Sequence, residues 1–154
     1  MRIHGKHFKT VWFENGKLQL INQPLLPFRF EILSFDDFRD VAEAIRIMIV
    51  RGAPAIGATA AYGMALAEMG DENIEEAAVI LRATRPTAQD LFYGIDAVTK
   101  AVSEGRSGLD CARALAEAYE KACLRIGELG AELIKEGMRL NTHCNAGWLA
   151  TVDW

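Results

Sequence analysis

Three short stretches of this sequence place an ionisable side chain close to the predicted start of a helix. Arg51 opens the stretch RGAPAIG, Arg85 lies in TRPTAQD, and Cys144 lies in THCNAG. A guanidinium and the unpaired amide groups of a helix's first turn can converge on one anion, such as a phosphate. A thiol in the same setting is drawn toward its thiolate form and can exchange protons. The first two stretches therefore indicate anion binding, and the third indicates acid/base chemistry.

In the first stretch, Arg51 is followed by Gly52 and Ala53, which leave room for backbone to approach a ligand closely. Pro54 suits the first turn of the next helix. The alternative is that Arg51 is a surface charge at the end of the preceding helix and that Gly52 only stops that helix. The spacing of the residues leaves both interpretations open.

Arg85 precedes Pro86, which biases its backbone toward an extended conformation just ahead of a predicted helix. From there the guanidinium could hold a phosphate or a hydroxyl group. The competing interpretation is an ordinary solvated arginine in a loop.

Cys144 lies near the carboxyl end of a predicted short strand, LNTHCN, which leads into a predicted helix in AGWLATVDW. Ligands bind at this edge in open α/β sheets, and helix amides there would lower the pKa of a thiol from about 8.5. A buried structural cysteine is the alternative. Neighbouring strand residues face opposite sides, so we expect a structural part for His143. His4 and His7, in the polar amino-terminal region, have no ligand-like context.

The elements that must position these side chains begin with a small sheet. Two β-type runs flank Asn15-Gly16, a dipeptide typical of a tight type I′ hairpin. A third run, FRFEILSF, places Phe28, Phe30 and Ile32 on one face and charged residues on the other. We therefore predict a three-stranded antiparallel sheet within residues 1–34.

From Ser34 onward the apolar spacing is that of helices, and we predict five. Ser34 with Asp37 forms a capping-box pattern for the first helix, which should end at Gly52, and Thr87 with Asp90 repeats the pattern for the fourth. The second helix, AIGATAAYGMALAEM, is rich in alanine and glycine and should lie inside the bundle. The third follows Asp71. The predicted buried positions of the first helix are Phe38, Val41, Ile45 and Met48.

The fifth helix should run toward Gly137 with one long apolar stripe. The stripe consists of Leu115, Tyr119, Ala122, Ile126, Leu129 and Leu133. We therefore expect a mainly α fold with a small amino-terminal antiparallel sheet. Its parts are the sheet (1–34), a helical bundle forming one domain with it (35–138), and the first strand and helix of a truncated, Rossmann-like α/β domain (139–154).

Composition excludes several classes of partner. The 154 residues include 17 lysines and arginines, which are scattered, and the net charge is −4, so neither nucleic acid nor an anionic membrane is indicated. No apolar run reaches the roughly 20 residues that span a bilayer, and the amino terminus lacks a signal-peptide core, which suggests a cytoplasmic protein. Cys111, Cys123 and Cys144 show no CxxC spacing. We expect no disulfide framework, metal or cofactor.

Taken in this order and at these separations, RGAPAIGATAAYG, TRPTAQDL and THCNAGWLAT resemble the amino-terminal half of methylthioribose-1-phosphate isomerases. The likeness covers the whole chain. It implies an aldose–ketose isomerase of methionine salvage, which converts 5-methylthioribose 1-phosphate to 5-methylthioribulose 1-phosphate by acid/base or hydride-shift chemistry between C1 and C2. It further implies substrate contacts from Arg51, Gly52, Ala53 and Arg85, and a catalytic acid/base group at Cys144.

The same resemblance implies a homodimer and a second acid/base group, an aspartate, in a carboxyl-terminal domain that has no matching position here. The apolar terminus formed by Trp148, Leu149, Val152 and Trp154 should then be exposed. We expect a fragment, a separately encoded half or a cleavage product that is inactive alone, with the missing domain supplied for example by a second chain.

Two other kinds of function share these motifs. Ribose-1,5-bisphosphate and 5-deoxyribose-1-phosphate isomerases differ at the C5 substituent, and the presence of only two pocket-like arginines, Arg51 and Arg85, favours a monophosphate. Non-catalytic regulatory subunits of the guanine-nucleotide exchange factor of translation initiation share the fold family. A thiol beside two anion-binding arginines favours the isomerase over the regulatory subunit.

Overall fold

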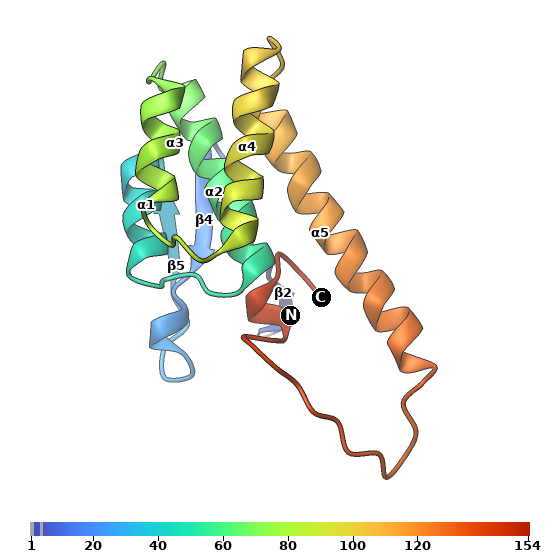
Figure 1. Cartoon of the computed structure of the whole chain (residues 1–154). Coiled ribbons are helices and arrows are strands. Elements are labelled where there is room, and N and C mark those ends of the chain that lie inside the picture. The colour runs from blue at the N-terminus through green and yellow to red at the C-terminus, as the bar shows by residue number, and fades with distance from the viewer. Residues whose placement is uncertain (1, 4) are drawn as a thin grey trace.

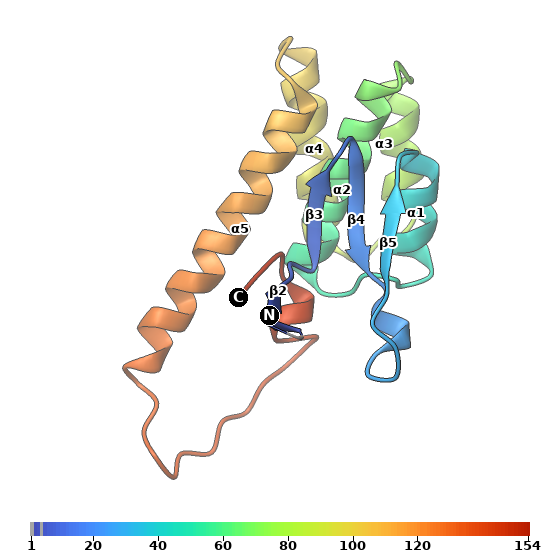
Figure 2. The ribbon, with the colours of Figure 1, turned by 180° about the vertical axis from the view of Figure 1, so that it is seen from behind.

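The computed structural model describes residues 2–3 and 5–154 of the chain. Helices cover one face of a small antiparallel sheet, as the opposite views in Figures 1 and 2 show. The expected class, a mainly helical chain with a small amino-terminal sheet, is confirmed. Within the described residues, no helix combines the length and the apolar character that crossing a membrane requires.

The sheet consists of β3 (Val11–Glu14), β4 (Lys17–Ile21) and β5 (Ile32–Phe35), in the order β3-β4-β5 with both pairs antiparallel. Asn15 and Gly16 have φ values of 52° and 77°, the positive pair that a type I′ turn requires. The predicted hairpin is therefore confirmed. A separate antiparallel pair of short strands, β1 (Arg2–Ile3) and β2 (Lys6–His7), precedes the sheet.

The third strand is shorter than predicted and presents the opposite face to the core. Phe28 is 95% exposed and Ile32 is 38% exposed. Leu33 lies opposite Leu20 in the ladder, and Leu20 is fully buried. Because directly paired residues share one face of a sheet, this register turns Leu33 inward and Ile32 outward.

The five predicted helices are present, but several of their ends differ from prediction. Asp37, not Ser34, caps the first helix by accepting a hydrogen bond from the Arg39 amide at 2.7 Å, because Ser34 belongs to β5. The fourth helix follows Ala88 without a side-chain cap, so the Thr87 capping box is also wrong. The helices are α1 (Phe38–Arg46), α2 (Ala53–Met69), α3 (Ile74–Arg82), α4 (Gln89–Ser103) and α5 (Gly108–Ala131).

Helix α1 stops before the predicted boundary at Gly52. Met48 adopts a left-handed conformation with φ 64°, and the Ile49 amide donates back to the Ala44 carbonyl at 2.9 Å. This is the kind of termination that a C-terminal cap provides. Met48 is consequently 46% exposed rather than buried, whereas Phe38, Val41 and Ile45 are buried as predicted.

Helix α2 lies inside the bundle, as its alanine- and glycine-rich sequence predicts. Residues 55–67 are all buried. A methyl group at Gly94 of α4 would lie 2.3 Å from the Gly57 carbonyl oxygen, so the two helix backbones are in direct contact. Both helices start at the same end of the bundle (Figure 1).

The carboxyl-terminal part of α5 and the chain after it stand away from the rest of the molecule (Figures 1 and 2). Every residue from 124 to 147 is exposed except the half-buried Gly130. We call residues 124–147 the arm and the other described residues the body. The predicted stripe is therefore wrong from Ala122 onward: Ala122 is exposed, and Ile126 is 70% and Leu133 is 73% exposed.

The arm also lacks the strand predicted at residues 140–145. The described chain has no strand there, since no neighbouring backbone lies alongside to complete a ladder. The predicted helix after it is reduced to one 3-10 turn, η2 (Trp148–Ala150). Within the described residues the strand and helix predicted for 139–154 are therefore absent, and an α/β domain that begins there stays a prediction.

Candidate functional site

The amino terminus of α2 is built around a required glycine. Gly52, the residue before the helix, has φ 94°, a conformation that side chains disfavour. A methyl group there would lie 2.3 Å from the Ala150 Cα. The space that the sequence suggested for a ligand is thus occupied in part by the chain's own backbone, and RGAPAIG is in contact with the segment that follows THCNAG.

The two predicted anion-binding arginines lead into helices that start at the same end of the bundle. Arg51 is exposed beside α2, and Arg85 is half-buried in the loop before α4. Among the described residues neither forms an ion pair, and the buried Nη1 of Arg85 has no hydrogen-bond partner. These guanidiniums therefore retain donor capacity for a ligand or water. Ala53, in the first turn of α2, is exposed.

Two further ionisable groups lie near this end and were not predicted as site residues. A methyl group on Gly57 would lie 2.8 Å from the Asp90 carbonyl oxygen and 2.9 Å from the Tyr119 hydroxyl, which is buried and without a partner. Burial raises the pKa of the Asp90 carboxyl. Burial, together with the nearby Asp90 charge, raises the pKa of Tyr119. Helical periodicity marked Tyr119 only as a core position, so no local signal pointed to this pairing.

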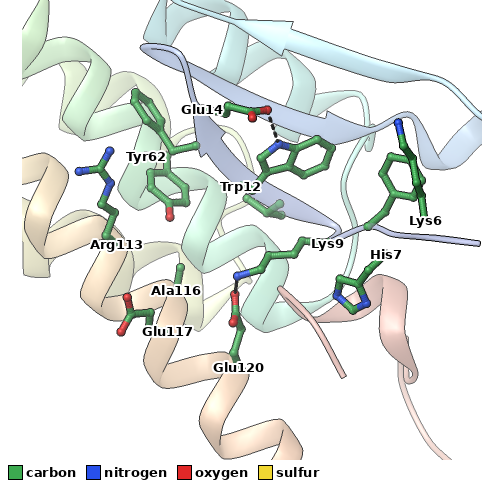
Figure 3. Close-up of a pocket in the computed structure, with 13 residues that line it drawn as sticks. Lys6, His7, Lys9, Trp12, Glu14, Tyr62, Arg113, Ala116, Glu117 and Glu120 are labelled. Carbon is green, nitrogen blue, oxygen red and sulfur yellow. Dashed lines mark hydrogen bonds and ion pairs between the residues drawn. The ribbon is translucent and has the colours of Figure 1, made fainter. Parts of the chain in front are cut away.

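A groove of about 600 Å³ lies between β3 and the first half of α5 (Figure 3). Lys9 and Glu120 form an ion pair across it. The Phe13 and Tyr62 rings stack with centroids 5.5 Å apart, and burial raises the pKa of Tyr62 to about 12. None of the predicted site residues lines this groove.

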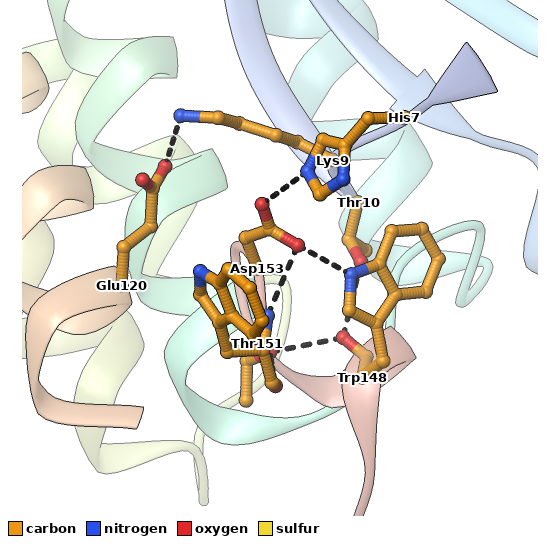
Figure 4. Close-up of polar contacts among 8 residues, drawn as sticks. His7, Lys9, Thr10, Glu120, Trp148, Thr151 and Asp153 are labelled. Carbon is orange, nitrogen blue, oxygen red and sulfur yellow. Dashed lines mark hydrogen bonds and ion pairs between the residues drawn. The ribbon is translucent and has the colours of Figure 1, made fainter. Parts of the chain in front are cut away.

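A second, smaller cavity of about 340 Å³ is lined in part by Asp153, whose exposed fraction is only 3%. Its carboxylate accepts hydrogen bonds from His7 Nε2 at 2.5 Å, from Trp148 Nε1 at 2.7 Å and from the Trp154 amide at 3.0 Å (Figure 4). Burial raises the pKa of Asp153, but the hydrogen bonds from Trp148 and His7 outweigh it and hold the pKa below its ordinary value. His7 thus has a partner that its local sequence did not reveal; His4 lies outside the described residues.

The carboxyl terminus is less exposed than predicted. Val152 is 1% exposed and Leu149 is half-buried, while Trp154 remains 59% exposed. The Thr10 amide donates to the Val152 carbonyl at 2.9 Å, which ties this segment to the start of β3. Most of the expected apolar patch at the terminus is therefore covered. Other exposed large apolar residues lie on the body, such as Phe28 and Val79, and a further group lies along the arm.

Cys144 is an exposed residue of the arm with φ 63°. Within the described residues the thiol is therefore not buried in a core. The helix expected beside the thiol is also missing, because the single turn η2 begins only at Trp148. Five residues separate Cys144 from Ala150, which lies against Gly52. Neither of the two cavities above includes Cys144, Arg51 or Arg85, so a cleft shared by these three residues stays a prediction.

Comparison with known proteins gives consistent matches along the chain. A methylthioribose-1-phosphate isomerase from Methylocella silvestris is 44% identical, in an alignment that covers 100% of this chain and 48% of the relative. The crystal structure of 5-methylthioribose 1-phosphate isomerase from Pyrococcus horikoshii OT3 is 43% identical with a TM-score of 0.84, covering 96% of this chain and 46% of that one.

A second solved structure carries a different description. The translation initiation factor eIF-2B, subunit delta, from A. fulgidus is 38% identical with a TM-score of 0.82, covering 96% of this chain and 48% of that one. The chain thus spans about half the length of each of these relatives. Residues 49–152, which include every predicted site residue, match the initiation factor 2 subunit family. The chain belongs to the initiation factor 2 subunit family.

Proposed function

We propose that this chain forms the amino-terminal part of an aldose–ketose isomerase that acts on 5-methylthioribose 1-phosphate. The observation that carries the proposal is the likeness to methylthioribose-1-phosphate isomerases over the whole chain, in sequence and in fold. The placement of Arg51 and Arg85 at one end of the bundle agrees with a phosphate site there.

In the proposed reaction the phosphate on C1 is held by Arg51, by Arg85 and by backbone amides at Gly52 and Ala53. The sugar ring opens when its ring oxygen gains a proton, and hydrogen then moves between C1 and C2. Cys144 serves as one acid/base group. A second group is needed to receive or return the other proton. The resemblance assigns it to an aspartate outside the residues of this chain.

We also propose that polypeptide corresponding to the rest of the relatives' length covers the arm. Six large apolar residues of the arm are at least half exposed in the described structure: Ile126, Leu129, Leu133, Ile134, Met138 and Leu140. Large apolar residues exposed together on one segment are typical of an interaction site. Residues 140–145 would gain a neighbouring strand in such an assembly, and Cys144 would then lie at a strand end as the sequence predicts. Dimerisation of the complete protein is part of this proposal.

Ligand-dependent melting of the purified chain tests the phosphate site. A ligand that binds the native state raises Tm by an amount that grows with the logarithm of its concentration relative to Kd. At about 100 times its Kd, 5-methylthioribose 1-phosphate should therefore raise Tm by several degrees. Arg85→Ala should abolish the shift. The matched control is Arg125→Ala, which removes an exposed arginine of the arm that is paired with Glu128 at 3.0 Å and should leave the shift intact. An equal shift with 5-methylthioribose, which lacks the phosphate, would contradict the proposal.

Fusing the chain to the remaining part of the P. horikoshii isomerase tests the chemistry. We expect aldose-to-ketose turnover that Cys144→Ser reduces severely without altering the melting curve. Cys111→Ser is the matched control, because Cys111 lies near the start of α5 and its thiol donates to the Ala97 carbonyl at 3.5 Å, outside the predicted site. Equal turnover of the Cys144→Ser and Cys111→Ser fusions would remove Cys144 from the mechanism.

A regulatory subunit is the second candidate, favoured by the likeness to the eIF-2B delta subunit. In that case a sugar phosphate could bind in the same place without being converted. A Tm shift that depends on Arg85, combined with a fusion that gives no turnover, would favour the regulatory candidate over the isomerase.

A further inference from the structure

Three of the four buried polar or charged residues in the described structure hold the carboxyl-terminal segment against the amino-terminal elements. The buried polar or charged residues are Thr10, Gln23, Thr59 and Asp153. Thr59 donates to the Ala55 carbonyl within its own helix. The other three join the amino-terminal elements to residues 148–153, which we call the docked segment.

The contacts of the docked segment converge on its backbone carbonyls. The Thr10 hydroxyl donates to the Trp148 carbonyl at 3.1 Å, and the Thr10 amide donates to the Val152 carbonyl at 2.9 Å. Gln23 Nε2 donates to the Leu149 carbonyl at 2.8 Å. Three of the segment's carbonyl groups are thus bound from the sheet side.

The other flank of the docked segment rests on α2. Ala150 is 4% exposed, and its Cα is the atom that a methyl group on Gly52 would strike at 2.3 Å. Asp153 closes the far end by accepting hydrogen bonds from His7 of β2 and from Trp148 of the segment itself (Figure 4). The segment therefore lies between the amino-terminal elements and the first residues of α2.

We propose that Thr10, Gln23 and Asp153 are positioning residues that fix the register of the docked segment, and thereby the place of Cys144 relative to Arg51 and Gly52. The catalytic meaning of that place rests on the proposed function. Burial of Ala150 and Val152 is non-directional and would tolerate a slip along the segment. Hydrogen bonds to particular carbonyls are directional, so they would be broken by such a slip.

The scale of such a slip makes register important. One residue of extended chain spans about 3.3 Å. A catalytic group displaced by about 1 Å can lose on the order of 100-fold in rate. Only three residues lie between Cys144 and the docked segment. A shift of the docked segment by one residue would therefore also move the Cys144 thiol.

Hydrogen exchange on the 154-residue chain tests the positioning role directly. The reporters are the Ala150 and Thr151 amides, which donate to Gly147 and Trp148 at 2.9 and 3.2 Å. Thr10→Val removes the hydrogen bond that ties the Trp148 carbonyl to the start of β3, while this carbonyl keeps the Thr151 amide and hydroxyl as donors. Loss of this tie should speed exchange of the reporter amides about 10-fold, while amides of α2 keep their protection. Thr10→Ser restores the hydroxyl and should restore slow exchange.

Thr59→Val is the matched control, because it makes the same change at a buried threonine that does not touch the docked segment. It should leave the two reporter amides unchanged. Unchanged reporters in Thr10→Val, or equal acceleration in Thr59→Val, would overturn the proposal. If Thr10→Val lost protection throughout α2 as well, Gln23→Leu would be measured in its place with the same expected and overturning results.

Measuring kcat and KM in a fusion that turns over 5-methylthioribose 1-phosphate distinguishes a positioning role of Thr10 from a role in stability alone. Thr10→Val should lower kcat about 10-fold or more with little change in KM, since Arg51 and Arg85 belong to the body. Acceleration of exchange without loss of kcat would overturn the positioning role. If no fusion turned over, the proposed function would fail, and the exchange experiment would still decide whether these residues fix the segment.

Discussion

The body and the arm carry similar helical patterns but differ completely in burial. In the body, Leu91, Ile95 and Val98 of α4 recur at helical spacing and are all fully buried. In the arm, apolar residues recur at the same spacing, yet Leu129 is 50% exposed and Ile126 70%. The difference teaches that periodicity identifies the face of a helix that can be buried. Whether it is buried depends on a neighbouring element, which periodicity does not supply.

The largest expected contrast is between two leucine truncations. Leu81→Ala removes a fully buried side chain and should lower the free energy of unfolding by about 3 kcal/mol through lost burial and the cavity left behind. Leu129→Ala, in the arm, should change it by less than about 0.5 kcal/mol. Urea denaturation of both variants measures the difference. Comparable losses would show that the arm is packed in solution.

A pair of glycine substitutions should have effects of opposite sign. Gly94→Ala places a methyl group 2.3 Å from the Gly57 carbonyl oxygen and should destabilise the chain by about 2 kcal/mol as α2 and α4 separate. Gly127→Ala meets no atom within 4 Å and should stabilise helix α5 by up to about 1 kcal/mol. Midpoints of urea denaturation report both changes. A destabilising Gly127→Ala would mean that the arm has a close neighbour.

The smallest effect concerns pH and the boundary between arm and body. The pKa of Asp153 is lowered in the folded chain, so its stabilising contribution is fully present above the unfolded value of about 3.9 and is lost as pH falls through the folded pKa. The difference in urea midpoint between the wild type and Asp153→Asn should therefore shrink as pH is lowered below about 4. A difference that stays constant from pH 7 to pH 3 would show that the Asp153 charge does not hold the docked segment.

Local sequence signals predicted the parts of the fold that depend only on residues close together in the chain. Asn15-Gly16 determined a hairpin because its positive φ angles suit few other residues. The alanine and glycine content of α2 predicted its burial. The predicted capping boxes failed for a different reason: Ser34 has the right spacing but is taken up by β5, and a capping pattern cannot show that a sheet competes for the same residue.

The candidate site was predicted in part. Arg51, Gly52 and Arg85 were predicted as site residues because helix starts and X-Pro steps leave signatures in sequence. They precede α2 and α4, which start at the same end of the bundle, and their part in a site stays a prediction. Asp153 was missed, although a lone carboxylate within the apolar run AGWLATVDW was a usable signal. Its partner His7 lies 146 residues away, so no local pattern could pair them.

The sequence by itself determined the helices, the hairpin and the order of the three motifs, because each depends on backbone preferences and on side chains a few residues apart. Only the tertiary structure decided which apolar faces are enclosed and which way β5 faces the core. It also decided that the segment after Cys144 returns to Gly52, where Ala150 takes the space that a side chain would need. These contacts join residues that are far apart in the sequence, so the spacing of residues along the chain does not predict them.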